Sequence, residues 1–316
     1  MPSTNNLPAQ WADRSIVALR PPKNPVDPRR PYAYLVEKER SAEGVVEDVA
    51  TIFLTNKECP FRCLMCDLWK NTLESSVPPG AIPEQIGWAL ARLPPARSVK
   101  LYNSGNFFDP QAIPESDYPA VAEAVSPFRK VIVESHPRMI GPRCVRFQEM
   151  VGDRLQVAMG LETAHPGVLA RLNKRMTLED FERATAGLVA RGVQVRAFIL
   201  LRPPFLDESE GVTWAKRSLD FAFDIGVECC AVIPTRGGNG VMEVLSQQGD
   251  FEAPTLTSLE EVIEYGVGLR RGRVLADLWD IERLASNGSE ERRRIERLKS
   301  INLAQRIPAD HGASSL

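Results

Sequence analysis

From residue 50 onward, short apolar runs alternate with longer segments that carry apolar residues at helical spacing. Runs such as residues 99–103 and 130–134 have the length of buried strands, whereas residues 178–191 show the 3.6-residue period of a helix with one apolar face. This alternation is typical of βα units, in which a helix returns the chain so that consecutive strands run parallel. The sequence therefore predicts an α/β fold built on a parallel sheet.

Six βα units are expected, with strands at residues 50–54, 99–103, 130–134, 155–161, 193–201 and 227–233, and helices near 83–93, 115–125, 142–151, 178–191, 211–225 and 259–270. Six units form an incomplete (β/α) barrel, and barrels of this kind carry their chemistry at the carboxyl ends of the strands. Three parts are predicted: residues 1–49 as an irregular arm followed by a strand pair (32–39 and 45–54), 50–240 as the core barrel, and 241–316 as a C-terminal helix, a late strand at 276–281 and a basic helix at 289–300.

Three cysteines follow the first strand of the barrel with the spacing C-x3-C-x2-C: Cys59, Cys63 and Cys66. A structural zinc site normally has four Cys or His ligands, but the next Cys or His along the chain is His136. A cubane iron–sulfur cluster held by thiolates fits three cysteines if one iron keeps an open position. Zinc, a disulfide knot and a cluster with an open iron remain as alternatives at this point.

The cysteine spacing resembles the radical SAM superfamily, in which the same loop follows the first barrel strand. The resemblance implies a [4Fe-4S] cluster on Cys59, Cys63 and Cys66 and a partial TIM-like barrel. It also implies that the open iron binds S-adenosylmethionine, which the cluster cleaves reductively to a 5′-deoxyadenosyl radical that abstracts a hydrogen atom from a substrate. Met65, before the last cysteine, is expected to pack near the adenine because its thioether is soft and adaptable.

Further contacts to S-adenosylmethionine are expected at the ends of the next strands. Where the superfamily has a Gly-Gly-Glu-like turn for the amino group, this chain has Ser104, Gly105 and Asn106, which keep backbone acceptors but lack the carboxylate. At the end of the third strand, Glu134 and Ser135 are expected to face the ribose hydroxyls.

The fourth to sixth strands supply the remaining candidates. The resemblance places Glu162 and Lys174 against the ligand, with Lys174 at the methionine carboxylate and Ile233 lining the adenine pocket. A strand-end acid is otherwise usually a solvated cap or an ion-pair partner.

Substrate contacts are predicted at the mouth of the barrel. Arg202 and Arg236 are candidate anchors for an anionic substrate because a guanidinium pairs with carboxylate or phosphate in a fixed fork. Glu208 is a candidate catalytic residue beside them, and Asp277 and Trp279 are candidate contacts in the late strand. Structural ion pairs are the alternative explanation for the arginines.

Several blocks together resemble a narrower branch, the one containing the archaeosine synthase radical SAM subunit and, more remotely, the elongator catalytic subunit: CPFRCLMCDLWKNT, SGNFFDPQAIP, ESHPR, LNKRMTLEDF and LLRPPFLDE. This resemblance implies a modified base in transfer RNA as substrate and an electron donor such as flavodoxin or ferredoxin. The alternatives are a radical SAM enzyme that acts on a small molecule in a biosynthetic pathway, and a non-catalytic metal-binding scaffold.

Composition limits the other functions. The formal net charge is −2, so the whole chain does not look like a polyanion-binding protein, and the basic segment 289–300 is interpreted as a solvated helix face. The sequence shows no signal peptide and no apolar run long enough to span a bilayer, which predicts a cytoplasmic protein without a membrane anchor. The remaining cysteines, Cys144, Cys229 and Cys230, are predicted to be buried free thiols.

Overall fold

The computed structural model describes residues 11–284 and 288–307; the first ten residues of the predicted arm and residues 308–316 of the predicted C-terminal part lie outside this range. One eight-stranded sheet holds the strands in chain order, β1 to β8. The strands are β1 (Ala33–Arg40), β2 (Val46–Phe53), β3 (Ser98–Tyr102), β4 (Lys130–Glu134), β5 (Leu155–Glu162), β6 (Gln194–Leu201), β7 (Cys229–Pro234) and β8 (Arg273–Ala276). β1 is antiparallel to β2, and every later neighbouring pair is parallel.

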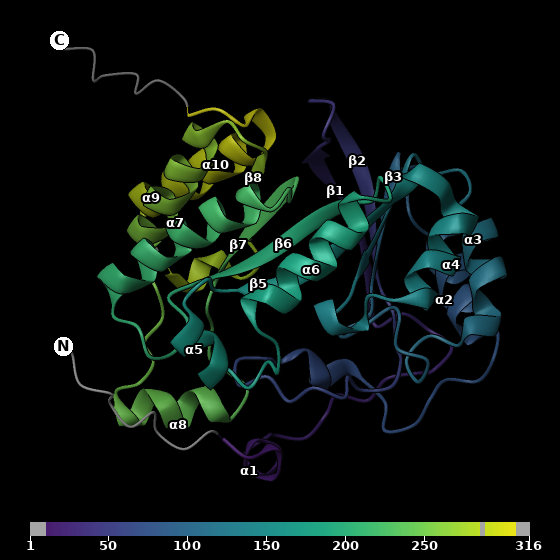
Figure 1. The fold of residues 1–316 in the computed structure, drawn as a ribbon, viewed down its shortest axis with the longest axis horizontal. Coiled ribbons are helices and arrows are strands. Elements are labelled where there is room, and N and C mark those ends of the chain that lie inside the picture. Colours follow the sequence, from purple (N-terminus) through teal and green to yellow (C-terminus); the bar gives the residue numbers. More distant parts are fainter. Residues whose placement is uncertain (1–10, 285–287, 308–316) are drawn as a thin grey trace.

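Helices cover the outside of the sheet (Figure 1). They are α1 (Asp13–Ala18), α2 (Ala81–Leu90), α3 (Tyr118–Ala124), α4 (Pro142–Val151), α5 (Pro166–Arg171), α6 (Leu178–Val189), α7 (Glu208–Asp224), α8 (Val241–Gln248), α9 (Leu256–Leu269) and α10 (Ser289–Ala304), with short 3-10 turns between them. In Figure 1, α2, α3 and α4 lie at the right, α7, α9 and α10 lie at the upper left, and α1 and α8 lie together at the bottom.

Strand residues alternate between two environments, because successive side chains of a strand point to opposite faces of the sheet. On β3, Val99 and Leu101 are fully buried in the main apolar core beneath the helices. Lys100, on the opposite face of the same strand, enters a buried polar network inside the curled sheet. The helices begin where their sequences favour capping: α6 and α7 start with reciprocal capping boxes, Thr177 with Asp180 and Asp207 with Glu210.

The predicted α/β partial barrel is confirmed, with differences at its ends. A late strand is present, but β8 ends at Ala276, where the predicted strand 276–281 begins, and it extends the parallel sheet beyond the six units expected. The arm predicted as irregular contains α1, and α5 and α8 were not predicted. These three helices are short, and a segment of six to eight residues shows too few turns for helical periodicity to stand out.

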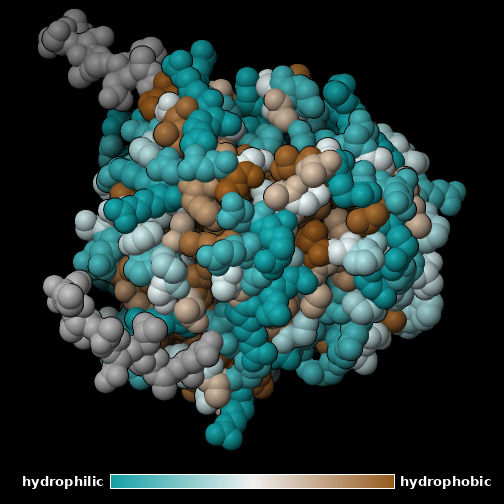
Figure 2. Space-filling model, viewed as in Figure 1, coloured by the Kyte–Doolittle hydropathy of each residue, from teal (hydrophilic) through white to brown (hydrophobic). Residues whose placement is uncertain are grey.

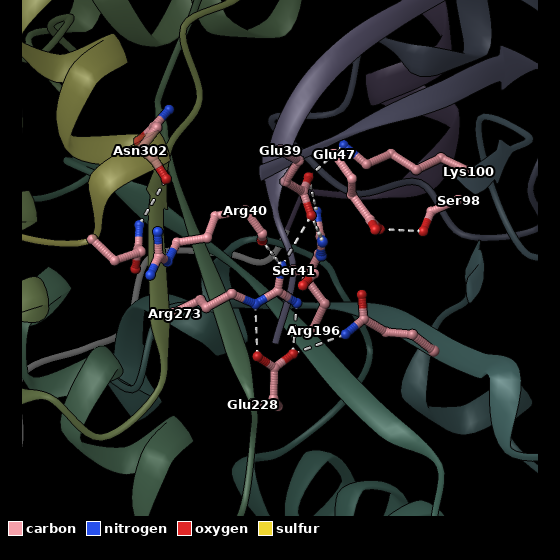
Figure 3. A network of polar contacts seen from close by, with 12 residues as sticks. Glu39, Arg40, Ser41, Glu47, Ser98, Lys100, Arg196, Glu228, Arg273 and Asn302 are labelled. Atoms are coloured by element: carbon pink, nitrogen blue, oxygen red, sulfur yellow. Dashed lines mark hydrogen bonds and ion pairs between the residues drawn. The ribbon is translucent and has the colours of Figure 1, made fainter. Parts of the chain in front are cut away.

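The amino-terminal ends of the parallel strands enclose a network of buried charges (Figure 3). The carboxylate of Glu39 on β1 lies 2.7 Å from Lys100 Nζ and 3.1 Å from Arg273 Nη1, and it also pairs with Arg196 of β6. Arg273 continues the network to Glu228 at 2.7 Å. Because Arg273 belongs to β8 and Glu39 to β1, these contacts join the two edge strands of the curled sheet.

The surface in Figure 2 carries hydrophilic and apolar residues in small interspersed groups. Across the described ranges, 11–284 and 288–307, no helix combines the length and the apolar character that crossing a bilayer would need. Cys144, Cys229 and Cys230 are buried free thiols, as predicted.

Candidate functional site

The cysteine loop follows β2 and is held from three sides. The side chain of Leu64, in the middle of the loop, is fully buried in an apolar cluster with Ile16 of α1 and Val241, Met242, Leu245 and Phe251 of the α8 region. The amide of Asn239 donates to the carbonyls of Leu64 and Cys66 at 2.8 and 3.1 Å, and the Trp69 indole donates to the Cys66 carbonyl at 3.0 Å. The carbonyls of Leu64 and Cys66 are therefore satisfied by protein donors, which fixes the backbone of the loop between the thiols.

All three thiols are free and half-buried. Burial is the largest cause that raises the pKa of Cys59 to about 11 and the pKa values of Cys63 and Cys66 to about 12, and in each case a neighbouring thiol of the trio contributes to the rise. The sulfurs therefore share one electrostatic environment, in which the thiolate form needs a nearby cation. A metal centre supplies such a charge.

Within the described part of the chain, no three His, Cys, Asp or Glu side chains are arranged to hold one metal ion. A closed mononuclear zinc site therefore finds no ligand set there. Three thiolates of a cubane each bind a different iron, so they stand further apart than the ligands of one ion. The donor set, three soft thiols without a fourth ligand, fits a cluster with an open iron better than it fits zinc.

The turn after β3 packs directly on this loop. A Cβ added at Gly105 would lie 3.2 Å from Cys59 Cβ, so glycine permits the close approach. Ser104 has a positive φ of 53° and its hydroxyl lies 2.8 Å from the hydroxyl of Tyr32. Asn106 donates from Nδ2 to Cys59 Sγ at 3.1 Å. The predicted Ser104–Asn106 turn thus lies beside the cysteine loop, with Asn106 directed at a sulfur.

Glu134, at the end of β4, is held by this turn. Its carboxyl accepts the backbone N–H groups of Asn103 at 2.6 Å and Gly105 at 3.3 Å. Burial raises the pKa of Glu134 to about 7, against the opposing effect of these N–H donors. Asn103 itself is fully buried, and neither polar atom of its side chain has a hydrogen-bond partner among the described residues. Unpaired buried groups of this kind are costly, and they fit a polar ligand at this strand end.

Ser135 and His136 continue from β4. Ser135 is buried, and its hydroxyl lies 3.4 Å from the His136 carbonyl. His136 stacks on Phe61 of the cysteine loop with ring centroids 3.9 Å apart, and burial lowers its pKa to about 3. Its Nδ1 accepts from the Arg138 N–H, so the proton is assigned to Nε2, which donates to the Lys174 carbonyl at 2.9 Å. A neutral histidine therefore joins β4, the cysteine loop and the segment of Lys174.

Glu162 and Lys174 form a buried ion pair, with Oε1 and Nζ 2.5 Å apart. Burial alone would lower the pKa of Lys174, but Glu162 and the nearby thiols Cys63 and Cys59 outweigh it, so the pKa is raised and the ammonium stays charged. Glu162 has a positive φ of 65°, and the pairing of β5 with β6 shifts register between Gly160 and Glu162. Such bulges redirect side chains next to functional sites.

Replacing Gly160 with alanine is expected to disrupt this pair, because the new methyl group would overlap Glu162 Oε1 and Lys174 Nζ. Overpacking of this kind costs about 1–3 kcal/mol. Chemical denaturation should therefore show a lower free energy of unfolding. Gly187→Ala on α6 is the control, since nothing lies within 4 Å of its added Cβ, and it should be neutral or slightly stabilising. Equal stability of the two variants would contradict the assignment of Gly160.

Met65 and Ile233 lie in one apolar cluster. Both are partly buried against Val168, Leu172, Leu200 and Leu206. The sequence predicted both as adenine contacts, and the structure brings them together on a shared apolar surface. Their packing is compatible with a flat, apolar ligand group.

The predicted substrate contacts are engaged in ion pairs. Arg202 pairs with Glu208 and Glu252 at 2.6 Å each, and Glu208 also accepts from Thr255 at the start of α9. Arg202 and Glu208 thus connect the end of β6 with the start of α9, which is a structural role. Arg236 after β7 pairs with Asp277 after β8. Trp279, two residues further, is 60% exposed.

Sequence reasoning missed several residues that hold the site: Tyr32, Asn103, His136 and Asn239. Asn239 carried a usable signal, because Asn preceding a helix is a favoured capping residue, and its Oδ1 indeed accepts the Met242 N–H of α8. Asn103 is the last residue of one predicted strand and His136 lies two residues after another, and polar side chains at such strand ends meet at one edge of a parallel sheet. Their partners are distant in sequence, so only the fold brings them together.

The chain was compared with known proteins. No protein-family model matches it. It is 21% identical over 254 residues to an uncharacterized protein of Methanocaldococcus jannaschii, covering 75% of this chain and 70% of that protein. It is 30% identical over 172 residues to archaeosine synthase subunit beta of Thermococcus kodakarensis, covering 52% of this chain and 53% of the relative. The chain therefore spans about half the length of that curated subunit.

Among solved structures, Streptococcus suis SuiB bound to the precursor peptide SuiA matches with a TM-score of 0.53 and 13% identity, over 73% of this chain and 50% of SuiB. At this identity the match bears on the fold alone, which it supports. The chain's sequence relatives include two proteins named archaeosine synthase subunit beta. The chain thus resembles the branch of the radical SAM superfamily that contains archaeosine synthase subunit beta.

Proposed function

We propose that this protein binds a [4Fe-4S] cluster on Cys59, Cys63 and Cys66 and uses it to cleave S-adenosylmethionine reductively. The observation that carries the proposal is a loop with three free thiols, in which a protein donor binds the backbone carbonyl of Cys66. The buried ammonium of Lys174 and the buried carboxyl of Glu162 lie next to this loop. When bound, the cluster supplies one electron to the sulfonium, giving methionine and a 5′-deoxyadenosyl radical that takes a hydrogen atom from the substrate. The electron comes from a donor such as flavodoxin or ferredoxin.

The chain's own residues would bind and orient S-adenosylmethionine. Lys174 supplies a buried positive charge for the methionine carboxylate, with Glu162 as its present partner. Glu134 offers a carboxyl for the ribose hydroxyls and Ser135 a neighbouring hydroxyl, while Met65 and Ile233 supply an apolar surface for adenine. Binding in such a partly buried site positions the reacting bond and excludes water.

The proposed substrate is a modified base in transfer RNA, by similarity to the proteins named archaeosine synthase subunit beta. The basic helix α10 adds little to this proposal, since Arg294 and Arg297 pair with Glu260 and Glu264 of α9. Arg236, Asp277 and the exposed Trp279 remain the candidate substrate contacts. The alternative is a small molecule of a biosynthetic pathway; retention of transfer RNA that weakens with rising salt would favour the RNA substrate.

The test is an anaerobic assay of the reconstituted full chain with S-adenosylmethionine and a chemical reductant. We expect formation of 5′-deoxyadenosine that depends on both. Binding of S-adenosylmethionine without any cleavage product would favour a non-catalytic protein. A protein that neither binds nor cleaves it would contradict the proposal outright.

A further inference from the structure

The side chain of Asn106 connects β4 with the cysteine loop. It is 2% exposed, and both of its polar atoms have partners. Its Oδ1 accepts the backbone N–H of His136 at 2.6 Å, and its Nδ2 donates to Cys59 Sγ at 3.1 Å. The ring of the same His136 stacks on Phe61 of the cysteine loop. Asn106 is therefore fixed between a rigid strand end and a single sulfur atom.

The orientation of this amide follows from its partners. A backbone N–H can only donate, so the atom facing His136 N must be the acceptor Oδ1. The amide nitrogen must then face Cys59. A flipped amide would set two donors against each other at His136 and direct an oxygen at the sulfur. The N–H···S contact is thus required by the backbone, whatever hydrogen positions are assigned.

We propose that Asn106 is a positioning residue whose amide raises the reduction potential of the cluster bound at Cys59. This inference rests on the proposed function, because it requires that cluster. Reduction adds negative charge to the cluster and its thiolates, and a donor directed at a thiolate sulfur stabilises that added charge. Hydrogen bonds to sulfur are among the factors that set the potentials of iron–sulfur clusters. The side chain of Asn106 therefore acts on the cluster, and the predicted backbone contact of this turn with S-adenosylmethionine is a separate role.

Two substitutions separate the hydrogen bond that Asn106 donates to the Cys59 sulfur from the hydrogen bond that it accepts from the His136 backbone. Asn106→Asp keeps an acceptor for the His136 N–H but replaces the donor at the sulfur with a carboxylate oxygen. Asn106→Ala removes both contacts without adding charge. Asn302→Ala is the matched control, since the Asn302 amide binds the backbone of β8 instead.

The experiment is a redox titration of the reconstituted full chain, followed by electron paramagnetic resonance of the reduced cluster. Both Asn106 variants should titrate at a more negative potential than wild type, with Asn106→Asp shifted further. At the wild-type midpoint, loss of one hydrogen bond should lower the ratio of reduced to oxidised cluster about fivefold in Asn106→Ala. Asn302→Ala should titrate as wild type does.

The outcomes distinguish this inference from the proposed function. A wild-type protein that binds no cluster would refute the proposed function. If the wild-type protein binds the cluster but both Asn106 variants keep the wild-type reduction potential, the inference about Asn106 is overturned and the proposed function stands. If the variants do not hold a cluster, the contact is tested by electron paramagnetic resonance of wild-type protein labelled with 15N-asparagine. A coupling between the nitrogen and the reduced cluster supports the contact, and absence of this coupling overturns it.

Discussion

Replacing Cys63 with alanine is expected to abolish cluster binding. The loop offers three thiols, and the described part of the chain assembles no substitute group of His, Cys, Asp or Glu ligands. Even loss of an outer-shell partner lowers metal affinity by about 10–100-fold, so loss of a ligand should exceed about 100-fold. Iron and sulfide content after reconstitution measures the effect, and 5′-deoxyadenosine formation should disappear with it.

Cys144→Ala is the matched control for this experiment. Cys144 is a free thiol on α4 that is buried in the main core, and it lies far from the cysteine loop in the sequence. Its loss should leave iron content at the wild-type value and lower stability slightly. Equal iron loss in both variants would indicate a general folding defect. Retention of iron in Cys63→Ala would contradict the assignment of the loop.

Replacing Glu39 with glutamine is expected to destabilise the fold by about 3–5 kcal/mol, because it leaves buried cations without their shared carboxylate. Glu39 pairs with Arg196, Lys100 and Arg273, and the side chain of Arg196 is only 3% exposed (Figure 3). Denaturant unfolding at neutral pH measures the change. Glu37→Gln on the same strand is the control: Glu37 also contacts Lys100, but its side chain is 44% exposed, and exposed pairs contribute about 0–1 kcal/mol.

The contribution of Glu39 also predicts an acid dependence. Burial alone would raise the pKa of Glu39, but Arg196 and Lys100 hold it well below its usual value. Since the folded-state pKa is the lower one, this stability is present above the unfolded pKa of about 4.3 and is lost as the pH falls through the folded value. The difference between wild type and Glu39→Gln should therefore shrink in acid. A difference that stays constant from neutral pH to strong acid would contradict this account.

The sequence predicted the fold best in segments whose local residue pattern matches their place in the folded chain. The parallel strands β2 to β7 were predicted because each is a short apolar run, and the cysteine loop was predicted because its spacing is itself the signal. The short helices α1, α5 and α8 were missed since their stability comes from packing, as for Ile16 and Met242 around Leu64. Propensity and periodicity carry little of that information.

The site shows the same division. Sequence position identified Glu134 and Glu162 as strand-end residues, and the resemblance identified Lys174 in the segment that follows, but neither showed that Glu162 and Lys174 pair with each other. The Ser104–Asn106 turn was predicted to offer backbone acceptors to S-adenosylmethionine, which stays a prediction, but the sequence did not show that the side-chain amide of Asn106 is directed at Cys59. Arg202 and Glu208 were predicted at the mouth, and they bind each other and α9. Partners far apart in sequence decide these roles, and a local motif does not identify them.

The most direct measurement is Mössbauer and electron paramagnetic resonance spectroscopy of the full chain reconstituted with iron and sulfide under anaerobic conditions, before and after addition of S-adenosylmethionine. We predict about four iron atoms per chain, as a [4Fe-4S] cluster requires, and a change in the signal of one iron when S-adenosylmethionine binds. A colourless protein that holds one zinc per chain, or a cluster whose spectrum S-adenosylmethionine leaves unchanged, would contradict the account.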